Sequence, residues 1–570
     1  MTQGQPLLAL RAGASEPSQV VVIRTRTPLA GRLMLQPQRH THPHRKVPGS
    51  LLVFTLGCLV GAVASVYAVR AGINLDYGDA LAHLTIAQRI SDSRSAGLSQ
   101  LGTVWLPLPH LLLLPLVQSE WLFSTGVAAC ILGSLCLGAS TTALYRIMVR
   151  LHLGRTAQVL GLLVFLANPA YLYLSTTALT EPVLIAALLM CIAGLAGWAF
   201  DKRSLSGGEL AVFAGVPAAL GALTRYEGWA LVLSGGCFVV IVALRRGMRL
   251  RRAVALALAF AGPSIMAVGW WLAYNLSVYG TPTKFLTGEY SAAAYTQVFA
   301  DTGRLTTAGN PGLSLQVLGE AMLENIGLAG LVVAGIGLLA MTAAWGIGDR
   351  ALLVWLAGTS TAFLFVSLTT GQHIMTNDVS LPTGAYNNRY VLSALPWIAL
   401  LCAVLVGLVR SRPRVATALV ALGAVALVWQ NVWWAQDPGT RISVIQEADI
   451  QHDAYREVKE VATWVGDHYD GGGILMDESA LLVTPVIGID HHAYVNRATG
   501  ELFVQALLNP YPVVKWVFMH RDVDSQVENV SSIDRVTAAL ADSPTFLLHY
   551  RVVHESPDFL VFRRVDAPAG

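Results

Sequence analysis

The sequence predicts an α-helical polytopic membrane protein with a small α/β domain at its C-terminal end. Of the 570 residues, 54% are hydrophobic and 13% are charged, and the mean hydropathy is +0.55. This is more apolar surface than the core of a soluble protein buries. Long apolar runs alternate with short basic clusters over most of the chain, and the composition becomes that of a soluble domain after about residue 440.

The first part of the chain, residues 1–48, is rich in Arg, His and Pro. We expect it to be a disordered basic tail on the cytoplasmic side of the membrane. The net charge of the whole chain is only +3, and its basic residues lie in short clusters between apolar runs. This pattern argues against nucleic acid as a partner.

The apolar runs between residues 49 and 438 predict transmembrane helices, because a helix needs roughly 20 apolar residues to cross the hydrocarbon layer. Ala62-Val63-Ala64 resembles a signal-peptidase site, but the apolar run continues to Val69, so an uncleaved first span is expected. The segment 104–118 is short and contains three prolines, which favours a re-entrant or interfacial element. About eleven spans are expected, near 51–70, 121–145, 157–176, 181–200, 210–224, 229–244, 253–275, 326–346, 351–370, 389–409 and 414–434.

Basic residues predict the orientation of these spans, because short cytoplasmic loops retain positive charge. The clusters fall in every second loop, at 146–155, 202–203, 245–252, Arg350 and 410–414. The N-terminus is therefore expected in the cytoplasm and the C-terminus outside the cytoplasmic membrane.

Residues 439–570 are predicted to form an extracytoplasmic α/β domain. A polar helical pattern over 446–468 begins it. Strand-like runs and helical patches follow. The strand-like runs lie at 473–476, 513–519, 545–553 and 558–564, and the helical patches lie near 501–508 and 533–541.

Charged residues stand at several helix ends on the predicted outer face. Asp76 and Asp79 follow the first span, with His83 one turn further on. Glu181 precedes a proline at the start of a later span, where helix capping alone would also explain an acidic residue. Carboxylates at the water edge of a span are costly unless they are solvated or paired, so they suggest a site.

Two further motifs on the same face contain arginine. Arg225, Tyr226 and Glu227 form a turn between two spans, and Arg389 and Tyr390 precede a late span. Carboxylates suit proton abstraction from a hydroxyl, and guanidinium groups bind phosphate through paired donors. The combination predicts a transferase that uses a lipid phosphate.

At these residues the chain resembles the GT-C superfamily of integral membrane glycosyltransferases, relatives of protein O-mannosyltransferases and aminoarabinose transferases. The resemblance covers roughly residues 50–410 and includes the stretch 275–285 (NLSVYGTPTKF), which contains Lys284. The family often has an Asp-Glu pair in the first outer loop, whereas Ala80 follows Asp79 here. Either Asp76 or Asp79 is therefore open as the functional acid, and Asp79 is favoured by its spacing to His83.

The resemblance implies a GT-C fold and an inverting single displacement. The donor would be a polyprenyl-phosphate sugar, and the acceptor would be a protein, lipid or glycan. Membrane lipids would surround the chain. No cofactor is expected, although the oxygens of Asp76, Asp79 and Glu181 would suit a divalent metal. The implied catalytic residues are Asp79, Asp76 and Glu181, and the implied substrate-binding residues are His83, Arg225, Tyr226, Glu227, Lys284, Arg389 and Tyr390.

Two other classes of function are compatible with a polytopic chain. A transporter or flippase of a lipid-linked or anionic substrate predicts charges near the bilayer midplane and an inverted repeat. A membrane scaffold that displays the C-terminal domain predicts that Asp79 is replaceable. The placement of the charges at helix ends favours the enzyme.

Overall fold

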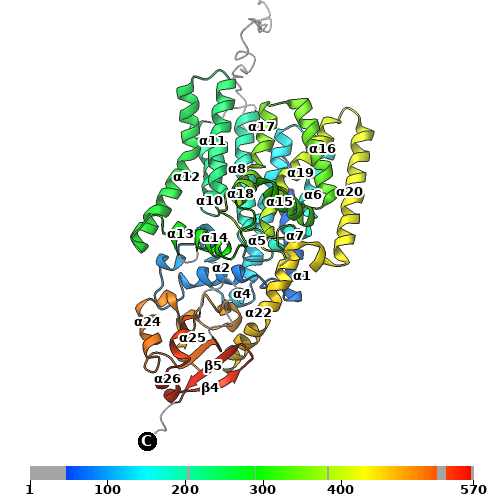
Figure 1. Ribbon diagram of the computed structural model, residues 1–570. Coiled ribbons are helices and arrows are strands. Elements are labelled where there is room, and N and C mark those ends of the chain that lie inside the picture. Colours follow the sequence, from blue (N-terminus) through cyan, green and yellow to red (C-terminus); the bar gives the residue numbers. More distant parts are fainter. Residues whose placement is uncertain (1–46, 202–205, 289–290, 382–383, 523–533, 566–570) are drawn as a thin grey trace, which may run out of the picture.

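The computed structural model describes residues 47–201, 206–288, 291–381, 384–522 and 534–565. A bundle of long helices occupies one end of the molecule and a small sheet the other, with short helices between them (Figure 1). The expected basic tail lies outside the described residues, apart from the last two residues of 1–48. Eight helical segments are long and apolar enough to cross a membrane, namely α1 (Ser50–Ala71), α5 (Val127–Arg150), α8 (Glu181–Phe200), α11 (Glu227–Arg245), α12 (Leu250–Tyr279), α16 (Leu328–Trp345), η4 with α19 (Asn388–Ala394 and Leu395–Leu408) and α20 (Pro413–Ala435).

The remaining predicted spans are shorter or broken in the structure. Helices α17 (Asp349–Leu356) and α18 (Thr359–Thr369) are bent by 54° and count as a ninth span if taken together. The predicted span 157–176 is divided into α6 (Arg155–Leu166) and α7 (Pro169–Leu174), because Asn168 caps a new helix whose first residue is proline. The predicted span 210–224 corresponds to α9, η3 and α10 (Gly207–Leu210, Ala211–Gly215 and Val216–Ala222). The described chain thus has eight or nine candidate spans, and the count of eleven stays a prediction.

The start of the second predicted span is corrected by the structure. The long helix α5 begins at Val127, and the short helix α4 (Glu120–Ser124) precedes it as a separate element. Gly126 adopts a left-handed conformation between the two helices, which ends the first and redirects the chain. The segment 104–118 contains only the six-residue helix α3 (Leu108–Leu113), so it forms no long helix, as predicted.

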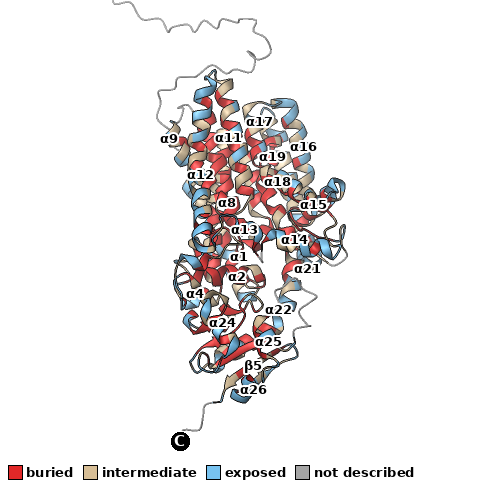
Figure 2. Cartoon of the chain, turned by 60° about the vertical axis from the view of Figure 1, so that its left-hand side comes forward, coloured by how far each residue is buried: buried red, intermediate tan, exposed pale blue. Residues whose placement is uncertain are grey.

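The outer helices of the bundle expose apolar side chains. In each of α1, α12, α16 and α20, only 17–22% of the most apolar 18-residue stretch is buried. In α8 and in the segment of η4 and α19, 83% of that stretch is buried. Figure 2 shows the same contrast between exposed outer helices and a buried centre. Exposed apolar patches this large indicate a lipid environment rather than water.

The two ends of the bundle differ in charge. At the end remote from the sheet, basic residues pair with single acidic residues: Arg150 with Asp201 at 3.4 Å, and Arg245 with Asp349 at 2.8 Å. The other end carries the carboxylates and arginines singled out from the sequence. Helix α2 (Gly78–Arg89), η2 (Leu98–Leu101), α13 (Lys284–Thr287), α14 (Ala292–Asp301) and α15 (Pro311–Asn325) are the other elements near this second end.

The C-terminal region is a mixed sheet with helices. Strands β1 (Ile474–Leu475), β2 (Tyr494–Val495) and β3 (Trp516–His520) are parallel, while β5 (Phe559–Arg564) pairs antiparallel with β3 and with β4 (Tyr550–Glu555). The order is β2-β1-β3-β5-β4. The remaining elements are α21 (Pro438–Arg441), α22 (Ser443–His468), α23 (Thr484–Ile487), η5 (His491–Ala493), η6 (Arg497–Thr499), α24 (Glu501–Leu508), α25 (Arg535–Leu540) and α26 (Pro544–His549).

Most predicted elements of this region are present, with one correction. The run 545–553, expected as a strand, begins as helix α26 and becomes β4 only at Tyr550. Ser543 accepts a hydrogen bond from the backbone of Phe546, and Pro544 occupies the first helical position, so local capping favours a helix there. Strand β2 (Tyr494–Val495) was not predicted from the sequence.

Candidate active site

The short helix η4 directs Arg389 into the end of the bundle. The loop before it is held by a bridge between Thr376 and Tyr386. The side-chain amides of Asn387 and Asn388 donate to the carbonyl oxygens of Ile374 and Thr376 at 3.1 and 3.0 Å. Asn387 has φ of 59°, a left-handed conformation that asparagine tolerates. These bonds turn the chain back so that the residue after Asn388 faces the bundle.

Arg389 lies at the centre of a cluster of carboxylates. Its side chain is only 4% exposed. Nη1 lies 2.9 Å from Glu447 Oε1, Nη2 contacts Asp79 Oδ2, and Nε lies 3.4 Å from Glu181 Oε1. The side chain of Asp79 is 40% exposed, whereas those of Glu181 and Glu447 are 2% exposed. Asp79 is therefore the carboxylate at the open edge of the cluster.

A second guanidinium group, that of Arg225, joins the same cluster. Its Nη1 lies 3.1 Å from Glu181 Oε1, and its Nε lies 3.0 Å from Glu227 Oε1. One oxygen of Glu181 is therefore shared between Arg225 and Arg389. Both guanidinium groups lie near the ring of Tyr390, with the Cζ atoms of Arg225 and Arg389 at 4.1 Å and 5.2 Å from its centroid.

Tight packing of α10 against α11 positions Arg225 and Glu227. Glu227 lies in the first turn of α11, where the positive end of the helix dipole favours a carboxylate. A Cβ atom on Gly228 would lie 2.2 Å from the carbonyl carbon of Gly221, so only glycine permits this approach. The corner between the two helices brings the short Arg-Tyr-Glu turn against the start of α8.

The cluster contains more acidic than basic groups. Asp79, Glu181, Glu227 and Glu447 face two guanidinium groups, which leaves two negative charges in excess when all are ionised. Burial raises the pKa of Glu447 to about 7, although Arg389 acts in the opposite direction.

His83 lies one turn after Asp79 and is held by a second histidine. Its Nδ1 lies 2.8 Å from Nε2 of His110, and its ring lies 4.6 Å from that of Trp105. Burial lowers the pKa of His83 to about 4, so the ring is neutral at pH 7. A neutral imidazole offers one donor and one acceptor.

Tyr226 and Lys284 lie at the edge of the site. Tyr226 packs on Trp229 and Phe285, with ring centroids 5.5 and 6.1 Å apart. Phe285 follows Lys284 in α13. Lys284 is half-buried and makes no ion pair within the described part of the chain. The structure therefore brings α13 to Tyr226 through Phe285 rather than through the lysine.

The two candidate aspartates have different partners. Asp76 is buried, and its Oδ1 lies 2.7 Å from Nδ1 of His452 and 3.5 Å from Nζ of Lys459, both on α22. Asp79 contacts Arg389 instead. This geometry favours Asp79 as the acid of the cluster and gives Asp76 a link to α22.

Glu447 was not singled out from the sequence, because it lies in a helix assigned to the C-terminal domain. A signal was nevertheless present. Val444, Glu447 and Ala448 are buried on one face of α22, so a carboxylate occupies the apolar stripe of an amphipathic helix. Charged residues are almost never fully buried unless they are paired.

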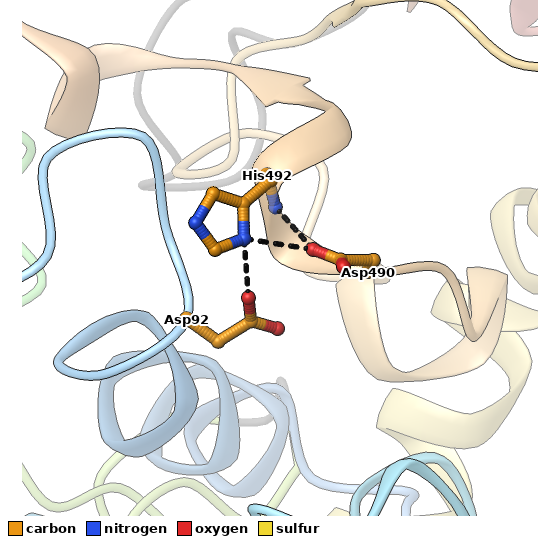
Figure 3. A group of neighbouring side chains, drawn as sticks. All are labelled: Asp92, Asp490 and His492. Atoms are coloured by element: carbon orange, nitrogen blue, oxygen red, sulfur yellow. Dashed lines mark hydrogen bonds and ion pairs between the residues drawn. The ribbon is translucent and has the colours of Figure 1, made fainter.

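The oxygens considered as metal ligands are not gathered together. Among the described residues, the group with three ligand atoms within 4.8 Å of one another is Asp92, Asp490 and His492 (Figure 3), and it does not include Asp76, Asp79 or Glu181. Nδ1 of His492 lies 2.6 Å from Asp92 and 3.0 Å from Asp490. The two carboxylates raise the pKa of this exposed histidine, so mutual ion pairing accounts for the group.

Comparison with known proteins finds a distant likeness to solved structures. No family model matches the chain, and no curated protein matches it. The crystal structure of the Archaeoglobus fulgidus oligosaccharyltransferase in complex with Zn and sulfate is similar with a TM-score of 0.44 and 11% identity, over 90% of this chain and 73% of that chain. A likeness this distant assigns no function, so the function proposed below rests on the site itself.

Proposed function

We propose that the chain is a membrane glycosyltransferase that transfers a sugar from a polyprenyl-phosphate donor to an acceptor hydroxyl on the extracytoplasmic face. One observation carries the proposal. A partly exposed carboxylate, Asp79, lies against the buried guanidinium group of Arg389 at the end of a bundle of apolar helices, with Arg225 beside it. A proton acceptor and anion-binding groups thus meet where a lipid phosphate would be presented.

The reaction would be a single inverting displacement. Asp79 accepts the proton of the acceptor hydroxyl, whose oxygen attacks the anomeric carbon. The bond between that carbon and the phosphate oxygen breaks as the new bond forms, and polyprenyl phosphate leaves with the electron pair. The developing negative charge on the leaving oxygen is stabilised by fixed positive groups.

Arg225 is the group best placed to bind the phosphate. Its Nε and Nη1 are occupied by Glu227, Glu181 and Thr180. Its other terminal nitrogen, Nη2, donates to no group within the described residues, which leaves it for the substrate. Glu181 and Glu227 would hold the guanidinium groups in place, Lys284 would contribute a further positive charge, and His83, Tyr226 and Tyr390 would contact the sugar.

A lipid-linked donor accounts for the site being at a bundle end. The polyprenyl tail would lie among apolar helix surfaces, while the phosphate and sugar would lie at the level of Arg225 and Asp79. The order of motifs that resembles GT-C enzymes supports the same conclusion. A transporter would instead place its charges near the bilayer midplane.

The proposal is tested with membranes that contain the full chain and a panel of radiolabelled polyprenyl-phosphate sugars. Transfer of label to an acceptor from one donor, and not from the corresponding nucleotide sugar, is the expected result. Movement or binding of the lipid without transfer from any donor would favour the transporter.

A further inference from the structure

Glu447 reaches the site from outside the helix bundle. It belongs to α22, which follows the last candidate span in the chain. Its side chain is 2% exposed, and its Oε1 lies 2.9 Å from Nη1 of Arg389, which is 4% exposed. Removing one member of a buried, charge-assisted pair leaves the other uncompensated. Arg389 therefore depends on Glu447 for its position.

Helix α22 also holds the start of α2, the helix that carries Asp79. The hydroxyl of Tyr77 donates to the carbonyl oxygen of Val444 at 2.7 Å, and the N–H of Gly78 donates to Oε1 of Gln451 at 2.9 Å. Both bonds lie directly before Asp79. Helix α22 thus holds the start of α2 through the Val444 carbonyl and the Gln451 side chain, and it holds Arg389 through Glu447.

The N-terminal end of α22 is itself anchored to the bundle end. The side chain of Asn325, at the end of α15, donates to Ser443 Oγ at 2.6 Å and accepts from the N–H of Val444 at 3.0 Å. The amide of Asn168 donates to the carbonyl oxygen of Asn325 at 2.7 Å. These bonds fix the first turn of α22 relative to α7 and α15, so Glu447 is presented in one place.

We propose that Glu447 is a positioning residue of the active site, and that α22 is therefore a structural part of the catalytic centre. The proposal rests on the proposed function and assigns Glu447 the role of holding Arg389 between Asp79 and Glu181. Without the carboxylate, the guanidinium group keeps only Asp79 and Glu181 as partners, and it shifts from the position that Glu447 imposes relative to Asp79.

The test uses the full chain with Glu447→Gln, Glu447→Asp and the matched control Glu460→Gln, an exposed residue on the same helix. A misplacement of about 1 Å costs on the order of 100-fold in rate. We expect Glu447→Gln to lower kcat by roughly 10- to 100-fold with little change in the KM for the donor, because the contact acts on the transition state. Glu447→Asp keeps the charge and should restore part of the rate, and Glu460→Gln should match the wild type.

A second measurement gives an answer whether or not a donor is found. Cryo-electron microscopy of the wild type and Glu447→Gln in lipid nanodiscs locates the guanidinium group of Arg389 relative to Asp79. Displacement in the variant supports the proposal, and an unmoved Arg389 overturns it. If the wild type is inactive but Arg389 is displaced in the variant, the glycosyltransferase function is rejected and the positioning role stands. If the wild type is active and Glu447→Gln is equally active, only the positioning role is rejected.

Discussion

His83 and His110 form a buried pair in which protonation is unfavourable. His110 is completely buried, and its Nδ1 has no hydrogen-bond partner within the described structure. An unpaired buried N–H is rarer than an unpaired acceptor. This favours Nε2–H of His110 donating to Nδ1 of His83, so that His83 carries its own proton on Nε2. The pair would then present a neutral donor next to Asp79.

The lowered pKa of His83 predicts how stability depends on pH. The ordinary pKa of 6.5 falls to about 4 in the folded protein, so the unfolded chain binds the proton more readily between these values. Stability is present above pH 6.5 and is lost as the pH falls towards 4, by about 3 kcal/mol from this residue. As the pH is lowered over this range, the melting temperature in detergent should fall less steeply for His83→Gln than for the wild type. Equal slopes would contradict the assignment.

Single residues show how far the sequence predicts the site. Asp79, Glu181, Arg225 and Arg389 were selected because each stands at a helix end on the face opposite the basic loops, and the structure brings them together. The sequence leaves Asp76 and Asp79 both open as the functional acid and favours Asp79 only by its spacing to His83, since Asp76 lies just before α2 and Asp79 lies in its first turn. Their partners lie far along the chain, at His452 and Arg389, and such pairings carry no local signal.

Helices α10 and α11 approach so closely that one methyl group decides their spacing. We predict that Gly228→Ala moves α11 away from α10 and displaces Glu227 from Arg225, because the added Cβ would meet the backbone of Gly221 at 2.2 Å. Activity and melting temperature should both fall. The free energy of unfolding should fall by about 1–3 kcal/mol, the amount typical of overpacking.

The matched control for this prediction is Gly236→Ala on the same helix. A Cβ on Gly236 meets nothing within 4 Å, so its stability should be unchanged or slightly higher, because alanine favours the helix. Transfer assays and thermal unfolding of the two variants distinguish them. Equal behaviour would show that the close approach at Gly228 is not needed.

Hydropathy predicted where apolar helices lie better than where they break. The run 157–176 reads as one span, yet it divides at Asn168-Pro169, where a cap and a proline act together. Pro263, in contrast, lies inside the 30-residue helix α12 without ending it. A proline alone removes one backbone hydrogen bond, and a membrane helix tolerates it where neighbouring groups satisfy the carbonyl that it frees. Hydropathy averages do not distinguish the two situations.

The molecule has a basic end and an acidic end, and this polarity predicts its orientation. Basic clusters mark the end with Arg245 and Arg412, and the opposite end carries α22 and the sheet. By the positive-inside rule, we expect the basic end to face the cytoplasm.

Labelling of single introduced cysteines tests this orientation in intact cells. Asp453→Cys, at a side chain that is 71% exposed on α22, should react with a membrane-impermeant maleimide. Arg412→Cys, in the loop before α20, should react only after the membrane is permeabilised. The parent chain, with its six cysteines, provides the background. The reverse pattern would invert the orientation and place the proposed site in the cytoplasm.

At the scale of the whole molecule, the predicted domain boundary at residue 439 does not separate the site from the C-terminal region. The composition changes there, as the sequence indicates, but α22 contributes Glu447 to the cluster and supports the start of α2. Removing residues 440–570 would therefore remove part of the site together with the sheet. Loss of activity in such a truncation says nothing about which region recognises the acceptor.

The most direct test of the account is transfer of radiolabelled sugar from polyprenyl-phosphate donors by membranes carrying the wild type, Asp79→Asn or the control Asp453→Asn. Asp79→Asn keeps the shape of the side chain and removes the proton acceptor, so transfer should fall by about 10²-fold or more. Asp453 is exposed and lies outside the cluster, so its variant should retain full transfer. Loss confined to Asp79→Asn is the predicted result, and undiminished transfer by Asp79→Asn would contradict the proposed chemistry.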